Sequence, residues 1–383
     1  MGERFVNNDP LHTPATRRRI QMRVVIVGAG LVGSLCALRL AEAGAEVEVL
    51  ERAVPGAEAS SAAAGILAAQ SEATRDDPRF ALTLASRDLY PALAAQLRAQ
   101  VGVDVGHRVC GVTEAARDAD HLQELTHRVA WQRARGLRAE VLDAAQLRAV
   151  EPALADGFVG GAHFPDDGAL DPGRLVRAVA QAAARAGVRF RSGVTVRGVR
   201  VEAGVARGVD TDAGLVEADT VLVAAGAWSG LVGGALRDPA AVRPARGQLV
   251  ALEVRPVPLN GVVFVREGYL VPRAEGEIIA GSTLEFVGYE RGVTARGLSR
   301  VLDLATRTAP RLADAVVART WSNFRPHSVD GAPLVGVGDA RGLLVATGHH
   351  RSGVVLAPVT AEIVRDLALR GETAWDAQCW APR

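Results

Sequence analysis

Apolar and polar positions near the start of the chain follow a strand, turn, helix and strand pattern. An apolar, β-branched run at 24–27 stops at a glycine-rich segment, 28–33. Leucines then recur three to four residues apart, as on one face of a helix. A second apolar run at 47–50 ends in Glu51. This order predicts a βαβ unit with two parallel strands.

Three glycines between the first strand and the helix suggest a role for this unit. Gly28 permits a tight turn, Gly30 lets a pyrophosphate approach the backbone, and Gly33 lets the helix pack closely on the strand. The N–H groups at the start of the helix attract an anion, and Glu51 stands about where a carboxylate reaches a ribose. The pattern predicts a dinucleotide site and leaves FAD and NAD open.

The remaining pattern alternates between α/β stretches and β-rich stretches. Residues 242–285 alternate as strands do, and 160–171 has the composition of a loop. Helical periodicity predicts five further helices, at about 80–101, 119–135, 171–186, 294–309 and 354–370.

This alternation predicts an α/β + β fold, in which a discontinuous Rossmann-like cofactor domain is combined with an antiparallel β-sheet substrate domain. We expect 1–21 to be a disordered leader. We place the cofactor domain at 22–98, 158–238 and 322–383, and the substrate domain at 99–157 and 239–321.

Composition narrows the class of protein. Lys plus Arg (44) nearly balances Asp plus Glu (43) in 383 residues, which gives no electrostatic case for nucleic acid. No apolar run reaches the ~18 residues that a membrane span needs, and no signal peptide is evident. Three scattered cysteines have neither metal-ligand spacing nor a disulfide pattern, so we expect a cytoplasmic protein without a metal site.

Two further segments carry candidate chemistry. The buried run at 219–226 ends in Ala225 and Gly226, small enough for a backbone to lie against a planar or phosphate-bearing ligand, although an ordinary core strand explains it equally well. At 347–358 a strand, a loop and a helix N-terminus carry an arginine and two histidines together. Such a helix end can stabilise a negative charge that develops on a ligand.

Six motifs that occur in one order carry a family resemblance. The segments are 24–51, SSAAAGILAA, VLVAAGAWS, GYLVPR, FRPHSVDGAPLVG and ATGHHRSGVVLAP. Together they resemble the glycine oxidase branch of the FAD-dependent D-amino acid oxidase superfamily, over about residues 23–370.

The resemblance implies FAD and a set of residues around it. No His or Cys is placed for an evident covalent link to the flavin, so we expect FAD to be bound non-covalently. The ADP half is expected to be bound by the glycine turn and its neighbours, the phosphates by Ala59 and Ser60, and adenine by the backbone of Val194. The isoalloxazine is expected to be covered by two loops and the small tip of a strand. The implied residues are Gly28, Gly30, Leu31, Val32, Gly33, Glu51, Arg52, Ala59, Ser60, Ala64, Gly65, Ile66, Val194, Ala225, Gly226, His349, His350, Arg351, Ser352, Gly353, Val354 and Val355.

The resemblance also implies substrate contacts. Arg325 and Arg351 match substrate-contacting arginines, and Tyr269 matches a pocket tyrosine. Leu284 stands where a methionine occurs in a relative, on the wall that senses side-chain size, and Glu267 also departs from the family pattern. A guanidinium is a planar donor well suited to the carboxylate of an amino acid.

The implied reaction is oxidative deamination of glycine, sarcosine and other N-substituted glycines, or small D-amino acids. Hydride transfer from Cα to the flavin gives an imine that water converts to an oxo acid, and O₂ is reduced to hydrogen peroxide. The family often supplies the imine for thiamine thiazole synthesis. No catalytic base is evident, and the histidines either tune protonation or contact FAD.

Several alternatives stay open at this stage. One is an oxidase that cleaves a larger N-carboxymethyl amine in secondary metabolism, and another is a D-amino acid dehydrogenase with a quinone acceptor. A non-catalytic nucleotide-binding module would not need the two arginines and Tyr269 on separate segments. The balanced charge argues against the tRNA-trimming enzymes of the same fold. The sequence leaves the formation of a homo-oligomer undecided.

Overall fold

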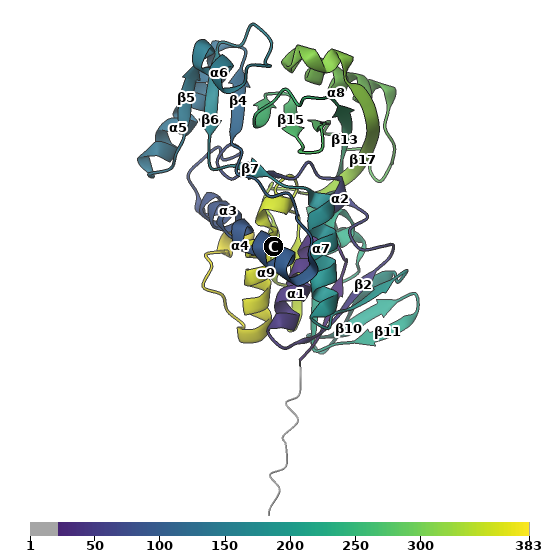
Figure 1. Cartoon of the computed structure of the whole chain (residues 1–383). Coiled ribbons are helices and arrows are strands. Elements are labelled where there is room, and N and C mark those ends of the chain that lie inside the picture. Colours follow the sequence, from purple (N-terminus) through teal and green to yellow (C-terminus); the bar gives the residue numbers. More distant parts are fainter. Residues whose placement is uncertain (1–21, 383) are drawn as a thin grey trace, which may run out of the picture.

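The computed structural model describes residues 22–382, so the leader expected at 1–21 lies outside the described residues. Figure 1 shows two parts stacked on each other. The lower part holds α1, α7 and α9, and the upper part holds α5, α6 and α8. Each part is built on one large sheet.

The lower sheet has six strands in a doubly wound order. All neighbouring pairs are parallel except the antiparallel pair at one edge, β18 with β19. Across the sheet the strands are β18 (Leu334–Val337), β19 (Leu343–Thr347), β12 (Thr220–Val223), β1 (Arg23–Val27), β2 (Glu46–Glu51) and β8 (Arg189–Ser192).

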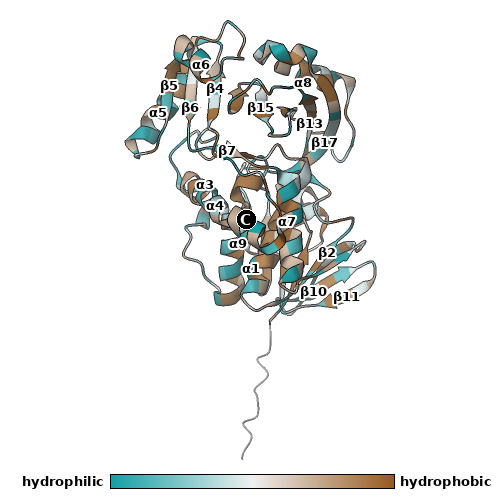
Figure 2. Ribbon diagram, in the orientation of Figure 1, coloured by the Kyte–Doolittle hydropathy of each residue, from teal (hydrophilic) through white to brown (hydrophobic). Residues whose placement is uncertain are grey.

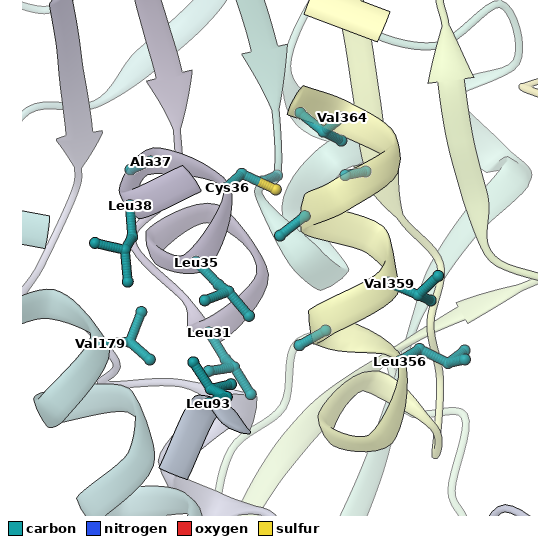
Figure 3. Close-up of a cluster of buried hydrophobic side chains, with 14 of the residues drawn as sticks. Leu31, Leu35, Cys36, Ala37, Leu38, Leu93, Val179, Leu356, Val359 and Val364 are labelled. Atoms are coloured by element: carbon teal, nitrogen blue, oxygen red, sulfur yellow. The ribbon is translucent and has the colours of Figure 1, made fainter. Parts of the chain in front are cut away.

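Helices cover one face of this sheet, and a small sheet covers the other. The helices are α1 (Leu31–Glu42), α3 (Pro78–Asp88), α4 (Tyr90–Val101), α7 (Pro172–Arg185) and α9 (Gly353–Arg370), and the small sheet has β9 (Val196–Glu202), β10 (Val205–Thr211) and β11 (Gly214–Glu217). Leu31, Leu35 and Leu38 of α1 are fully buried against the neighbouring helices, as Figure 3 shows. This packing fixes the N-terminus of α1 beside the C-terminal end of β1.

The upper sheet has eight strands, antiparallel apart from the parallel pair of β14 and β4. They are, in order, β17 (Val316–Ser328), β13 (Val242–Glu253), β16 (Glu277–Gly281), β15 (Gly268–Pro272), β14 (Val262–Val265), β4 (Val112–Ala116), β6 (Gly160–Phe164) and β5 (Glu140–Asp143). The helices that accompany them are α5 (Ala119–Ala134), α6 (Ala144–Val150) and α8 (Ala295–Thr308).

The remaining elements are short. They are α2 (Ala59–Ala62), the two-stranded pair β3 (Ile66–Leu67) and β7 (Gly168–Ala169), and the 3₁₀ helices η1 (Gly226–Leu231), η2 (Pro239–Ala241), η3 (Pro310–Asp314) and η4 (Gln378–Trp380).

The predicted fold class is confirmed: a Rossmann-like α/β sheet is combined with a largely antiparallel one. The domain boundaries stay a prediction. Relative to them, β6 follows the boundary at 158 yet pairs within the upper sheet, and β17 continues across the boundary at 322.

Two predicted elements are wrong in detail. The segment 160–171 contains β6 and β7 instead of a continuous loop. Its glycines are there because neighbouring backbone lies too close for a side chain: a Cβ on Gly161 would lie 2.5 Å from the Glu114 oxygen. The single helix expected at 80–101 divides at Leu89 into α3 and α4, and Pro91 occupies the first turn of α4.

Hydropathy follows this arrangement. Figure 2 shows hydrophobic residues along α1 and α9 and hydrophilic ones on the peripheral helices α5 and α8. Within residues 22–382, no helix combines the length and apolar character that crossing a membrane requires.

A buried carboxylate between β6 and β7 holds the segment that follows β3. Asp167 is completely buried and accepts hydrogen bonds from the backbone N–H groups of Gln70 (3.0 Å) and Ser71 (2.8 Å) and from the Ser71 hydroxyl (2.9 Å). Arg87 of α3 forms an ion pair with it at 3.2 Å. Burial raises the pKa of Asp167, and these donors offset only part of that rise.

We predict that Asp167→Ala destabilises the fold by about 3–5 kcal/mol, because it leaves Arg87 and several backbone donors without their buried acceptor. Urea denaturation of the purified protein measures the change. The adjacent Asp166→Ala is the control, since its ion pair with the exposed Arg138 lies at the surface and should contribute far less to stability. Equal losses in the two variants would contradict a central role for Asp167.

Candidate functional site

One large cavity runs between the two parts of the molecule, with a volume of about 680 Å³. That volume is typical of a site for a cofactor or small ligand. The cavity begins at the turn between β1 and α1, passes α2 and the tips of β12 and β19, and ends against β13, β15 and β17 of the upper sheet.

Most of the site residues predicted from the sequence line this cavity. They are Gly28, Gly30, Leu31, Val32, Glu51, Arg52, Ala59, Ser60, Ala64, Gly65, Ile66, Val194, Ala225, Gly226, Tyr269, Arg325, His349, His350, Arg351, Gly353, Val354 and Val355. The structure therefore brings together residues that are more than 300 positions apart in the chain.

Three nominated residues lie outside the lining. Gly33 faces β1, and Ser352 lines only a neighbouring cavity. Leu284 does not line the main cavity, and its side chain is 54% exposed. That Leu284 contacts the substrate side chain stays a prediction, and its exposed position does not support it.

The turn at the first end of the cavity requires its glycines. Gly28 has a φ of +101°, and a Cβ there would lie 2.6 Å from the Ala224 oxygen. A Cβ on Gly33 would lie 2.1 Å from the Gly28 oxygen. The backbone of α1 thus reaches β1 and β12 without side chains between them, and the first residues of the helix, Leu31 and Val32, line the cavity.

Polar groups at this end are arranged around the start of α1. The backbone N–H of Leu31 donates to the Ser60 hydroxyl at 2.8 Å. Glu51 accepts from the N–H groups of Ala29 and Ala53, each at 2.9 Å. A carboxylate has about four lone-pair sites, so Glu51 retains acceptor capacity for hydroxyl groups.

A cluster of charged and aromatic residues flanks the same end, and sequence reasoning missed most of it. The Arg52 guanidinium lies 3.9 Å above the ring of Trp228 and pairs with Glu58 at 2.8 Å. Arg291 pairs with the same carboxylate at 2.6 Å. Trp228 belonged to a recognised motif, but nothing in the sequence placed Glu58 or Arg291 beside it.

The opposite end of the cavity presents two guanidiniums and a phenol. Arg325 of β17 lies flat against β13: a Cβ on Gly247 would lie 2.3 Å from its Nη1. The side chain donates to the Ser282 hydroxyl at 2.5 Å and to the Thr283 carbonyl at 3.2 Å. With five N–H donors in a guanidinium, Arg325 can still bind a carboxylate.

Arg351 approaches from the loop between β19 and α9. Its Nη2 atom lies 2.8 Å from the Oε1 atom of Glu72, a residue that no motif pointed to. Glu72 is the largest influence that raises the pKa of Arg351, while burial lowers it. Tyr269 is buried at this end and packs beside Phe264.

Two adjacent histidines at this end are held neutral. Burial lowers the pKa of His349 to about 4, and its Nε2 lies 3.1 Å from the Thr360 hydroxyl. The pKa of His350 falls to about 3, through burial first and then through His327, Arg325 and Arg351. Both imidazoles therefore add no positive charge at neutral pH.

The pattern of side chains supports small-molecule binding. Residues 22–382 contain no group of three or more His, Cys, Asp or Glu side chains that could hold a metal ion. The arrangement combines an anion-binding helix end, a carboxylate able to bind hydroxyl groups and, at the far end, cationic donors suited to a carboxylate.

The neutral His349 predicts a pH-dependent stability. Its folded pKa of about 4 lies below the unfolded value, so the unfolded chain binds the extra proton as pH falls below about 6.5, and the free energy of unfolding decreases. We expect His349 to account for about 2 kcal/mol of loss between pH 7 and pH 5. Urea denaturation of His349→Asn should show a correspondingly weaker pH dependence. The exposed His127→Asn should keep the wild-type dependence, and equal dependence in all three proteins would contradict the prediction.

The chain is similar to known proteins over most of its length. The sequence model of a family described as FAD dependent oxidoreductase matches residues 23–367. A glycine oxidase of Geobacillus kaustophilus is 35% identical over 357 residues, covering 92% of this chain and 94% of the relative. The bifunctional protein ThiO/ThiG of a Synechocystis species is 36% identical over 353 residues, covering 90% of this chain. The chain spans only 51% of that longer relative.

A solved structure is similar over the same extent. The crystal structure of glycine oxidase from Geobacillus kaustophilus superposes with a TM-score of 0.90 at 33% identity, covering 95% of this chain and 99% of that one.

Proposed function

Because the chain belongs to the family of FAD dependent oxidoreductases, we propose that it oxidises glycine, sarcosine and other N-substituted glycines, or small D-amino acids. The prediction of FAD as cofactor is confirmed by the family match. The proposed substrate class rests on the relatives named glycine oxidase and on the guanidinium of Arg325 at the end of the cavity.

The residues present fit FAD. The glycine turn brings backbone N–H groups to one end of a cavity of about 680 Å³, where a pyrophosphate would be bound. Glu51 can accept ribose hydroxyls, and Ser60 lies beside the helix end. Ala64 and Gly65 line the cavity and carry no large side chain, which leaves room for a planar ring beside them. Gly65 itself packs against Leu170, since a Cβ there would lie 2.2 Å from the Leu170 oxygen.

When bound, FAD supplies the hydride acceptor for the oxidation of the amine. The chain itself binds and orients the substrate. We assign Arg325 to the substrate carboxylate and Tyr269 to the apolar wall and one hydrogen bond. The cationic guanidiniums and neutral imidazoles disfavour a protonated amine, which favours the neutral form that the reaction needs.

The overall reaction converts the amine to an imine, which water hydrolyses to an oxo acid, with reduction of O₂ to hydrogen peroxide. A quinone acceptor and a larger N-carboxymethyl amine are the alternatives, and no contact in the site favours either. A cytoplasmic location, a homo-oligomer and a role in thiamine thiazole synthesis stay predictions.

We predict that the purified, yellow protein loses its flavin absorbance when glycine or sarcosine is added without air. Admitting air should restore the colour and release hydrogen peroxide, which a peroxidase-coupled assay measures. The same assay across glycine, sarcosine, D-alanine, D-proline and bulky N-substituted glycines ranks the substrates. Absorbance that none of these amines changes would contradict the proposal. Bleaching that only a quinone reverses would assign the other acceptor.

We also predict that Arg325→Ala raises KM for sarcosine about 10- to 100-fold, since a charge-assisted hydrogen bond contributes about 1.5–3 kcal/mol. FAD content, measured from the absorbance ratio of the purified protein, should change little. Arg319→Ala is the matched control because Arg319 lies on the same strand but pairs with the peripheral Glu277. Parallel losses of FAD and activity in Arg325→Ala would instead indicate a structural role.

A further inference from the structure

Glu72 lies where the main cavity meets a second one. The second cavity has a volume of about 470 Å³ and shares six lining residues with the first: Glu72, Tyr269, Ser282, His349, His350 and Arg351. Glu72 is 26% exposed and Arg351 is 53% exposed at the side chain, so their ion pair stands at the surface of both cavities. A substrate at this end would meet the pair directly.

The segment just before Glu72 is held by hydrogen bonds to buried side chains. The buried carboxylate of Asp167 binds the backbone of Gln70 and Ser71, the two residues just before Glu72. Arg128 adds a hydrogen bond to the Ser71 carbonyl at 2.5 Å. Glu72 therefore extends from a fixed segment, and its pairing with Arg351 does not depend on a mobile loop tip.

The ion pair sets the charge at this end of the cavity. Among the described residues that line it here, the charged ones are Glu72, Arg325 and Arg351. Arg325 makes hydrogen bonds but no ion pair within residues 22–382, whereas Glu72 compensates Arg351. The neutral imidazole of His350 leaves this balance unchanged. One uncompensated positive charge remains.

The other charged groups of the second cavity add no further uncompensated positive charge. Glu114 pairs with Arg128 at 2.6 Å, and Glu124 pairs with Arg266 at 3.2 Å. Glu267 is exposed there and adds a negative charge. A second carboxylate on a substrate would thus find no free guanidinium and would face Glu72 and Glu267.

We propose that Glu72 determines specificity by compensating Arg351, so that the site accepts amines with one carboxylate and rejects those with two. This inference rests on the proposed function, because it specifies the substrate class of the same site. Glu72 acts in two ways: it neutralises Arg351, and its carboxylate faces the cavity.

The test replaces Glu72 with glutamine, which keeps an oxygen that can accept from Arg351 but removes the negative charge. The ratio of kcat/KM for iminodiacetate to that for sarcosine should rise at least about tenfold, equal to about 1.4 kcal/mol. Calorimetry on the holoenzyme should show the same shift in the affinity for malonate relative to acetate. Glu72→Asp restores the charge and should return both ratios towards wild type.

Glu124→Gln is the matched control, because it removes a carboxylate from the same cavity without touching Arg351. Unchanged ratios in Glu72→Gln, or an equal rise in Glu124→Gln, would overturn the inference. If the wild type oxidises no amine, the proposed function fails. The malonate and acetate affinities still decide the role of Glu72, and failure of both ligands to bind would overturn it.

Discussion

The close backbone contact at the β1–α1 turn is the constraint on which the site depends. The oxygen of Gly28 occupies the place where a Cβ on Gly33 would stand, and Gly28 itself lies against Ala224 at the tip of β12. This contact sets the position of α1 relative to two parallel strands. The start of the helix consequently lines the cavity, where the Leu31 N–H donates to Ser60, while Glu51 is held by the backbone at the end of the adjacent strand.

From that fixed end the cavity extends to a second sheet of different construction. The lower sheet supplies backbone donors and small residues, which suit a large cofactor. The upper sheet supplies Arg325 from the edge strand β17, which pairs with β13 along its whole length, and Tyr269 from β15, which is hydrogen-bonded to β14 and β16. The two sheets contribute different groups because of their geometry. The C-terminal ends of parallel strands lead into loops and helix N-termini, whereas the face of an antiparallel sheet presents side chains.

The sequence was informative where the chemistry is local. The glycine turn, the helix start and Glu51 lie within one βαβ unit, and their spacing alone predicts their arrangement. Gly160 and Gly161 were misjudged as loop because their requirement comes from Leu142 and Glu114, residues distant in sequence. Glu72 carried no signal for the same reason, since its partner Arg351 lies on another segment. Motifs that carried the family resemblance located the arginines, but Leu284 shows that a matching position does not guarantee a place in the cavity.

The bare backbone of Gly247 beside the Arg325 guanidinium has a consequence for how this protein tolerates change. Residue 247 contributes no functional group, yet any side chain there would occupy the volume of the guanidinium. The two positions, on adjacent strands, are therefore coupled, because a side chain at 247 would displace the flexible end of Arg325. In a redesign of the pocket, a substitution at position 247 would move the Arg325 guanidinium, although residue 247 itself contributes no functional group.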